Sequence, residues 1–412
     1  MRPLLLLVFV GAVGCTKTTS KARSLGYDDA VAFYAAQPRF LQPIPYSEVP
    51  EGLPDLEAAT CGKCHVEIYE EWKISTHARA WTDDAQFMAE LEKSNKQGVG
   101  WMCINCHTPM VNQLPRLVAK LEDGAVEKPI FVDNPRFSEA LQKDAITCGT
   151  CHVKDGQILG PYGDTIAPHP VKKDPSLLKV DVCTQCHQAK AEWRHIALAC
   201  VFDTGQEYAA SDYDEAGKTC QSCHMPEVTR PVATNGKPRK TRRHWFGGSL
   251  IPKHPRFTDE LAKLRAHYPP GLEATWVNAP DEVQPTQPLG ITYRYTNANA
   301  GHMLPSGDPE RFIRIELEAR TEGGPLIRDQ FEIGSVYQWS PEVKKLSDNR
   351  LKPKEAREGV LRFTAPKSGP IYVTLKASRF RINEENLAYH DLEGKYVAGQ
   401  HFLTTTATIA VR

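Results

Sequence analysis

Hydrophobic and polar positions divide the chain into three stretches of different character. Residues 4–13 form one short apolar run, and residues 56–265 carry short, irregular apolar segments interrupted by proline and polar loops. From about residue 271 onward, apolar and polar positions alternate strictly in several separate runs. Because strands have a side-chain period of two, these last runs predict strands that are buried on one face.

The alternation in the last third is most regular in four runs. Apolar side chains occupy every second position at Ile313–Ala319, Ile371–Ala377, Ile291–Tyr295 and Leu403–Val411. Gly and Pro interrupt the pattern at 323–325 and 367–370, as expected of turns. We therefore predict an α+β multidomain protein, in which a mostly helical and irregular domain over 56–265 precedes an all-β antiparallel sandwich over 271–412.

Two further elements follow from the same pattern. Ile68, Tyr69, Trp72 and Thr76 fall on one face of a helix predicted over 66–78. Over residues 16–55 we expect a tether with one short helix near 27–36.

The N-terminus predicts export. Arg2 precedes the run at 4–13, which has the length of a signal-peptide core and is too short to span a bilayer. The segment Ala12-Val13-Gly14-Cys15 resembles a bacterial lipoprotein signal, in which Cys15 becomes the acylated first residue. The alternative is an ordinary cleaved signal with an incidental cysteine. We expect residues 1–15 to be the signal, and the protein to be a membrane-anchored lipoprotein on the periplasmic or cell-surface side of an outer membrane.

Composition narrows the classes of partner. The 412 residues carry 50 Lys and Arg against 50 Asp and Glu, so no basic excess indicates nucleic-acid binding. Arg and Lys gather only between Arg230 and His244. That stretch is either a solvated basic loop or a face that binds carboxylates or an acidic partner.

Cysteine is the unusual component, with ten of the twelve residues in five copies of one motif. The sequence C-x-x-C-H occurs at Cys61-Cys64-His65, Cys103-Cys106-His107, Cys148-Cys151-His152, Cys183-Cys186-His187 and Cys220-Cys223-His224. This pattern is typical of covalent haem c attachment, because two thiols on one helical turn reach the porphyrin vinyl groups and the adjacent histidine binds the iron. Zinc sites and disulfides also use such cysteines, but neither requires a histidine after every second cysteine.

Five haems within about 160 residues leave little room for an aliphatic core, so we expect the porphyrins to form much of it. The motifs begin at residues 61, 103, 148, 183 and 220. Without haem, this region should fold poorly. Cys200, in an apolar stretch, is expected to be a buried and inert thiol.

The ligand opposite each motif histidine decides whether an iron only carries electrons or also binds a small molecule. Nine histidines lie outside the motifs, of which we expect six as distal candidates, in falling order His77, His169, His244, His302, His195 and His254. His77 lies twelve residues beyond His65, about 18 Å along a helix, so it should reach a neighbouring haem. Prolines on both sides hold His169 in an extended loop. His267, His390 and His401 are expected at the surface or in turns.

Three segments resemble one known family. Cys61 to His77, the run Cys220–Pro226 followed by His244-Trp-Phe-Gly-Gly, and Gly301–Gly307 are similar to segments of cytochrome c-554 and related multihaem cytochromes. The resemblance implies electron transfer, with His77, His169 and His244 as distal ligands. This sequence departs from that family in having five motifs and an added β domain.

The sequence therefore favours an electron carrier over an enzyme, with five haems held mainly between two histidines and no assigned catalytic residue. Other cytochromes or a membrane quinone-linked donor are the expected partners. The alternative is a multihaem oxidoreductase that acts on small nitrogen or sulfur compounds at one open haem. No C-x-x-C-K variant occurs, and no dense cluster of His, Tyr and Arg is visible along the sequence.

Overall fold

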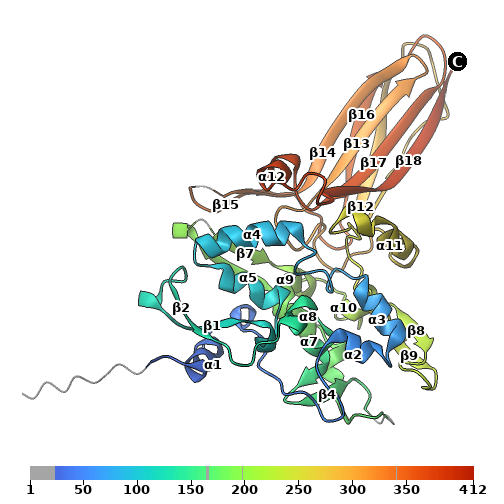
Figure 1. The fold of residues 1–412 in the computed structure, drawn as a ribbon. Helices are drawn as coiled ribbons and strands as arrows, with labels where there is room; N and C mark the ends of the chain where they lie inside the picture. Colours follow the sequence, from blue (N-terminus) through green and yellow to red (C-terminus); the bar gives the residue numbers. More distant parts are fainter. Residues whose placement is uncertain (1–23, 164–166, 197, 340) are drawn as a thin grey trace, which may run out of the picture.

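The computed structural model describes residues 24–163, 167–196, 198–339 and 341–412. The predicted signal peptide and Cys15 lie outside these residues. The helices and short hairpins from α1 to η7 (residues 27–267) form one body, which we call the motif region. The long strands from β10 to β18 (residues 272–411) project from it, and we call them the β region (Figure 1). Within the described residues, no helix is both long and apolar enough to cross a membrane.

The motif region is built from short helices joined by irregular segments. Its α-helices are α1 (Tyr27–Ala35), α2 (Ala58–Gly62), α3 (Val66–Lys73), α4 (Ala85–Lys96), α5 (Gly100–His107), α6 (Glu139–Lys143), α7 (Cys148–His152), α8 (Asp181–His187), α9 (Thr204–Ala209), α10 (Cys220–His224) and α11 (Thr258–Ala262). Its 3-10 turns are η1 (Arg39–Leu41), η2 (Val111–Gln113), η3 (Glu122–Gly124), η4 (Pro175–Leu178), η5 (Arg194–Ile196), η6 (Pro255–Phe257) and η7 (Lys263–His267).

Small sheets connect these helices. The strands are β1 (Arg116–Leu121), β2 (Pro129–Asp133), β3 (Val153–Lys154), β4 (Gln157–Gly160), β5 (Val171–Lys173), β6 (Ala189–Trp193), β7 (Leu198–Phe202), β8 (Glu227–Arg230) and β9 (Arg239–Arg242). They form the hairpins β1–β2, β6–β7 and β8–β9 and the sheet β3–β4–β5. The basic stretch predicted over 230–244 is therefore mostly one side of the β8–β9 hairpin.

The short helix predicted near 27–36 is confirmed as α1, whereas the expectation of a tether is wrong from residue 27 onward, because this segment packs on the motif region. Ala30 and Tyr34 of α1 are buried beside Trp101 of α5. The hydroxyl of Tyr34 accepts a hydrogen bond from the backbone N–H of Val118 at 3.2 Å. Aromatic side chains such as Tyr34 bury enough apolar surface to hold the segment against the motif region.

The helix predicted over 66–78 is shorter in the structure. α3 ends at Lys73, and a turn over 75–80 follows, in which the Ser75 hydroxyl accepts from the backbone N–H of Ala78 at 3.4 Å. Side-chain oxygens of serine compete with helical hydrogen bonds in this way. His77 consequently lies on a turn and not on a helix.

The β region contains two sheets. One has the order β10–β12–β16, and the other has the order β11–β18–β17–β13–β14–β15 and curls. The elements are β10 (Leu272–Trp276), β11 (Glu282–Val283), β12 (Pro288–Asn297), β13 (Phe312–Thr321), β14 (Gly324–Gln338), β15 (Lys344–Asp348), β16 (Ala356–Thr364), β17 (Ile371–Phe380), α12 (Glu384–Tyr389) and β18 (Gly399–Val411).

One apolar core joins the two sheets. Ile291 of β12 and Leu361 of β16 belong to the same buried cluster as the inward side chains of β13 and β17. The alternation is confirmed, because all four apolar positions of Ile371–Ala377 are fully buried. Each buried Leu or Ile there contributes about 1.5–3 kcal/mol relative to exposure. The pairing is antiparallel except that β11 runs parallel to β18, which corrects the expectation of a wholly antiparallel domain.

Polar contacts join the two regions. Arg350 of the β region donates to Glu207 of α9 at 2.6 Å, and Ser306 donates to the other oxygen of the same carboxylate at 2.5 Å. Tyr396 donates to Gln86 of α4 at 2.7 Å. These contacts place the loops 301–311 and 381–398 of the β region against the motif region.

Candidate haem-binding sites

Each C-x-x-C-H motif lies on or directly beside a short helix. The second to fifth motifs end α5, α7, α8 and α10, and the first begins within α2. In the first motif, the backbone N–H of His65 donates to Cys61 at 2.9 Å, so the helical turn continues to the histidine. The spacing thus places both thiols and the imidazole of a motif on neighbouring turns of backbone, as haem attachment requires.

Four of the five motif histidines face a second histidine. The ring centroids are 6.4 Å apart for His65 and His169, 6.4 Å for His77 and His187, 6.2 Å for His152 and His244, and 6.3 Å for His224 and His302. Two imidazoles that bind one metal from opposite sides, each through a nitrogen about 2 Å away, bring their centroids to roughly 6–6.5 Å. The four pairs therefore fit a six-coordinate iron between them.

Backbone carbonyls hold most of these rings in one tautomer. Nδ1 donates to a carbonyl in the following pairs: His65 to Val232 at 2.6 Å, His107 to Ala80 at 2.6 Å, His152 to Leu159 at 2.9 Å, His224 to Gly247 at 2.5 Å, His244 to Arg242 at 3.0 Å and His302 to Met303 at 2.8 Å. A proton fixed on Nδ1 leaves the lone pair of Nε2 free to bind a metal.

Burial keeps these rings neutral. Desolvation, together with nearby imidazoles, lowers the pKa of His77 to about 3 and that of His187 to about 4. Burial also lowers the pKa of His244 to about 4. Neutral imidazole is the form that binds a metal, so these side chains are in the binding form throughout the neutral range.

The positions of the distal candidate His169 and of the motif histidine His224 depend on close packing around a glycine. Gly52, with φ of +85°, approaches the Pro168–His169 segment so closely that a Cβ would lie 2.8 Å from the Pro168 carbonyl oxygen. A Cβ on Gly247 would lie 2.4 Å from the Tyr268 ring, and the Gly247 carbonyl holds His224. A larger residue at either position would displace the histidine beside it.

The other distal candidates lie elsewhere. His195 is exposed and lies 3.4 Å from Glu127, and His254 accepts a hydrogen bond from the backbone of Arg256. His267 packs on Trp245, His390 pairs with Glu90, and His401 bonds Thr404. Neither His195 nor His254 faces a motif histidine, so we do not propose them as ligands.

The second motif differs from the other four. All fourteen histidines are described, and none is paired ring to ring with His107. Its ring stacks instead on Phe87 of α4, with centroids 3.5 Å apart and planes at 6°. A phenyl ring cannot bind iron, so the described side chains supply no second imidazole for this site.

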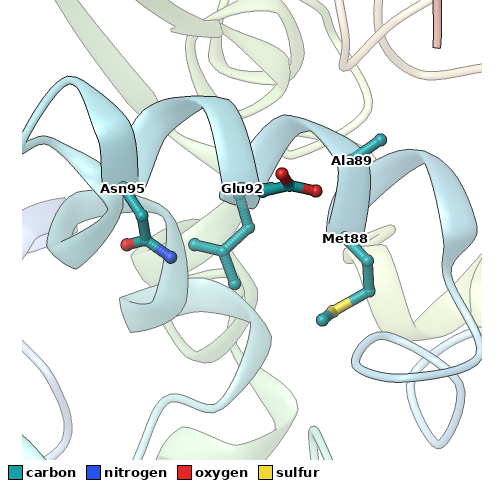
Figure 2. Close-up of a pocket in the computed structure, with 5 residues that line it drawn as sticks. Met88, Ala89, Glu92 and Asn95 are labelled. Atoms are coloured by element: carbon teal, nitrogen blue, oxygen red, sulfur yellow. The ribbon is translucent and has the colours of Figure 1, made fainter.

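Helix α4 covers the second motif. A pocket of about 420 Å³ runs along it, lined by Met88, Ala89, Leu91, Glu92 and Asn95, and Met88 and Asn95 project from the same side of the helix (Figure 2). α4 packs closely on α5, because a Cβ on Gly100 would lie 3.2 Å from a methyl of Leu91. The second motif therefore lies beside α4, along which this partly apolar pocket runs.

The motifs are adjacent to one another in space. Cysteines of different motifs lie close together: Cys61 beside Cys148 of the third motif, Cys106 of the second beside Cys186 of the fourth, and Cys183 of the fourth beside Cys220 of the fifth. His77, which follows the first motif, faces His187 of the fourth. Every motif therefore touches a neighbour, which sequence spacing alone did not show.

A buried ion-pair cluster positions His244. Glu71 of α3 accepts from Arg230 and Arg243 at 2.6–2.7 Å and from the backbone N–H of His244 at 2.9 Å. Arg230 and Glu71 are each about 5% exposed. Two arginines of the predicted basic stretch thus pair internally and do not form a solvated loop.

The remaining described cysteine, Cys200, lies outside the motifs. Burial raises the pKa of Cys200 to about 12, which agrees with the inert thiol predicted. Among the described residues, no three or more His, Cys, Asp or Glu side chains gather as a metal cluster.

These features define a c-type cytochrome with several haems, and the comparisons agree. The family described as cytochrome c554 and c-prime matches residues 60–128. The fold is similar to a penta-heme cytochrome c552 from Thermochromatium tepidum, with a TM-score of 0.58, 17% identity and coverage of 85% of this chain and 97% of that one. The chain is a multihaem c-type cytochrome that resembles the cytochrome c554 family over residues 60–128.

A more distant relative is the cytochrome c nitrite reductase subunit NrfA of Nitratidesulfovibrio vulgaris. It is 25% identical over 210 residues, which cover 47% of this chain and 37% of that protein. The chain therefore matches little more than a third of this relative.

Proposed function

We propose that the protein is an exported pentahaem c-type cytochrome that transfers electrons through four haems with two histidine ligands each. The ligand pairs are His65 with His169, His77 with His187, His152 with His244, and His224 with His302. The four ring separations of 6.2–6.4 Å are the observation that carries this proposal.

The chain's own residues suit this task in three ways. Histidines on both sides exclude small molecules from four irons, and carbonyl bonds to Nδ1 fix the rings, so little rearrangement accompanies a change of charge. His77, which follows the first motif, faces His187 of the fourth, so neighbouring sites are held close together. The haems, when bound, supply the reversible one-electron chemistry.

We further propose that the chain is held at a membrane by lipid on Cys15 and exchanges electrons with other cytochromes or a quinone-linked donor. Covalent haem c supports export, and the apolar run before Cys15 supports the anchor.

A second function is favoured by the one motif that departs from the others. His107 has no imidazole opposite it, so an iron bound there keeps a free position. Redox chemistry on a small nitrogen or sulfur compound at this haem, supplied with electrons by the other four, is therefore our second candidate.

Electron paramagnetic resonance of the ferric holoprotein tests both proposals. We expect four low-spin haems and one high-spin haem, and carbon monoxide should bind one of the five reduced haems. His77→Ala should convert one further haem to high spin, whereas His401→Ala, at an exposed histidine, should change nothing. Five low-spin haems would contradict the open site, and an unchanged spectrum of His77→Ala would contradict the ligand pairs.

A further inference from the structure

A cluster of charged side chains lies where the β region meets the motif region. We call Lys253, Arg311 and Arg381 the interface cations. Lys253 precedes η6, Arg311 precedes β13 and Arg381 follows β17. Tyr396 and Asp84, which is the N-cap of α4, lie among them. The sequence separates these residues by up to 312 positions, which is why no cluster was visible there.

Arg311 and Arg381 donate hydrogen bonds to backbone carbonyls. Arg381 is about 6% exposed, donates to the Ile251 carbonyl at 2.7 Å, and leaves its buried Nε without a hydrogen-bond partner. Arg311 donates to the Ser306 carbonyl at 3.1 Å. Within the described residues, neither guanidinium forms an ion pair, whereas Lys253 pairs with Asp84. Burying a cation without an anion beside it raises the free energy of the folded protein. A negatively charged ligand that bound between these arginines would lower it.

The charges of these groups repel one another. Burial and the nearby Arg381 lower the pKa of Arg311, and Asp308 only partly offsets them. Burial lowers the pKa of Lys253 to about 8, although the neighbouring Asp84 raises it. Burial raises the pKa of Glu310 to about 8, so this nearby carboxyl is protonated at neutral pH and adds little negative charge. Three cations thus face the two carboxylates Asp84 and Asp308.

The cluster lies beside the second motif. Asp84 caps α4, whose Phe87 stacks on His107, and the charges of Asp84 and Lys253 both act on the pKa of His107. Arg311 likewise acts on His187 of the fourth motif. Among the interface cations, Lys253 is therefore near the one haem site that has no second histidine, and Arg381 reaches the same segment through its bond to the Ile251 carbonyl.

We propose that the interface cations bind a small exogenous oxyanion next to the His107 haem, with the β region supplying two of the three cations. This proposal rests on the second candidate function above. Guanidinium groups present planar pairs of N–H donors that match the oxygens of an oxyanion, and the surrounding burial strengthens each bond. A cationic or wholly apolar ligand would leave Arg311 and Arg381 uncompensated.

Haem propionates carry the same carboxylate chemistry and are the competing source of an anion. A propionate would occupy the cations permanently, whereas an exogenous anion would bind reversibly and compete with others. The two sources therefore predict different behaviour of the same arginines.

The experiment uses the full-length ferric holoprotein and measures dissociation constants of nitrite and sulfite from the absorbance change of the high-spin haem. Carbon monoxide binding to the reduced protein serves as the uncharged reference. We expect Arg381→Gln and Arg311→Gln each to weaken both oxyanions roughly tenfold or more and to leave carbon monoxide within about twofold. Arg311→Lys should recover part of the loss.

Arg314→Gln is the matched control, because Arg314 lies three residues beyond Arg311 and pairs with Glu332 at 2.9 Å. Its oxyanion affinity should equal that of the parent. Unchanged affinity in both arginine variants, or loss of haem from them, would overturn the proposal and favour propionate binding. Absence of any carbon monoxide binding in the parent would instead overturn the open haem itself, so the two failures are distinguishable.

Discussion

The β region and the motif region bury apolar surface in different ways. One continuous cluster runs through both sheets of the β region, from Leu272 to Ile409. In the motif region, buried side chains fall into several separate clusters, and the largest lies around Trp101 and Leu114. Most motif cysteines are half-buried, Cys64 and Cys223 are exposed, and none of them belongs to these clusters. The difference shows that side chains alone complete the β core, whereas the motif region depends on its cofactors for much of its interior.

The largest expected effect comes from omitting the haems. A chain produced without haem attachment should keep the β region folded while residues 56–265 lose cooperative structure, because the separate clusters bury too little surface to offset chain entropy. Hydrogen exchange would measure this, with protection expected in β13 and β17 and little in α5 and α7. Equal protection of both regions in the haem-free chain would contradict the comparison.

Leu375→Ala should destabilise only the β region. Leu375 is fully buried in β17, and its loss leaves a cavity that costs about 2–5 kcal/mol. Thermal unfolding followed by circular dichroism should show the change, while the haem absorbance at room temperature stays as in the parent. Lys376→Ala, at the adjacent exposed position, is the control.

Glu71→Gln should act in the motif region instead. It removes the carboxylate that Arg230 and Arg243 share, and unpaired buried charges typically cost about 3 kcal/mol or more. The electron paramagnetic resonance signal of the haem that His244 binds should also shift, because the backbone N–H of His244 loses its carboxylate acceptor. Glu70→Gln, at an exposed neighbour, should change neither quantity.

The contribution of Glu71 to the free energy of unfolding should decrease as the pH falls. Burial alone would raise the pKa of Glu71, but hydrogen bonds from Arg230, Arg243 and His244 outweigh it and lower the pKa below its usual 4.5. The stabilisation is therefore complete above about pH 4.5 and disappears as the pH falls through the lower, folded-state pKa. Denaturant unfolding should show the parent approaching Glu71→Gln with acid. A constant difference between the two would contradict this assignment.

The smallest effect is expected at the exposed contact between the regions. Lys354 and Asp212 pair at 2.5 Å, and both side chains are about 60% exposed. Solvent and salt screen such a pair. Lys354→Met should therefore leave the melting temperature of either region unchanged within error. A clear shift would mean that the two regions are coupled more strongly than their separate cores suggest.

The sequence by itself determined the cofactor chemistry and the two kinds of domain. Both are local properties, because C-x-x-C-H is complete within five residues and the alternation of Ile313–Ala319 is complete within one strand. The four histidines found opposite motif histidines, His77, His169, His244 and His302, are also the four that the sequence ranked first, although His77 lies on a turn and not on the predicted helix.

Only the tertiary structure decided which histidine faces which motif, that His107 faces none, and that cations from both regions meet beside it. His152 and His244 are 92 positions apart and Asp84 and Lys253 are 169 apart, and no local pattern encodes such contacts. Burial and charge pairing depend on the whole fold. From the sequence alone, Arg381 cannot be distinguished from an ordinary surface arginine, whereas in the structure it is buried.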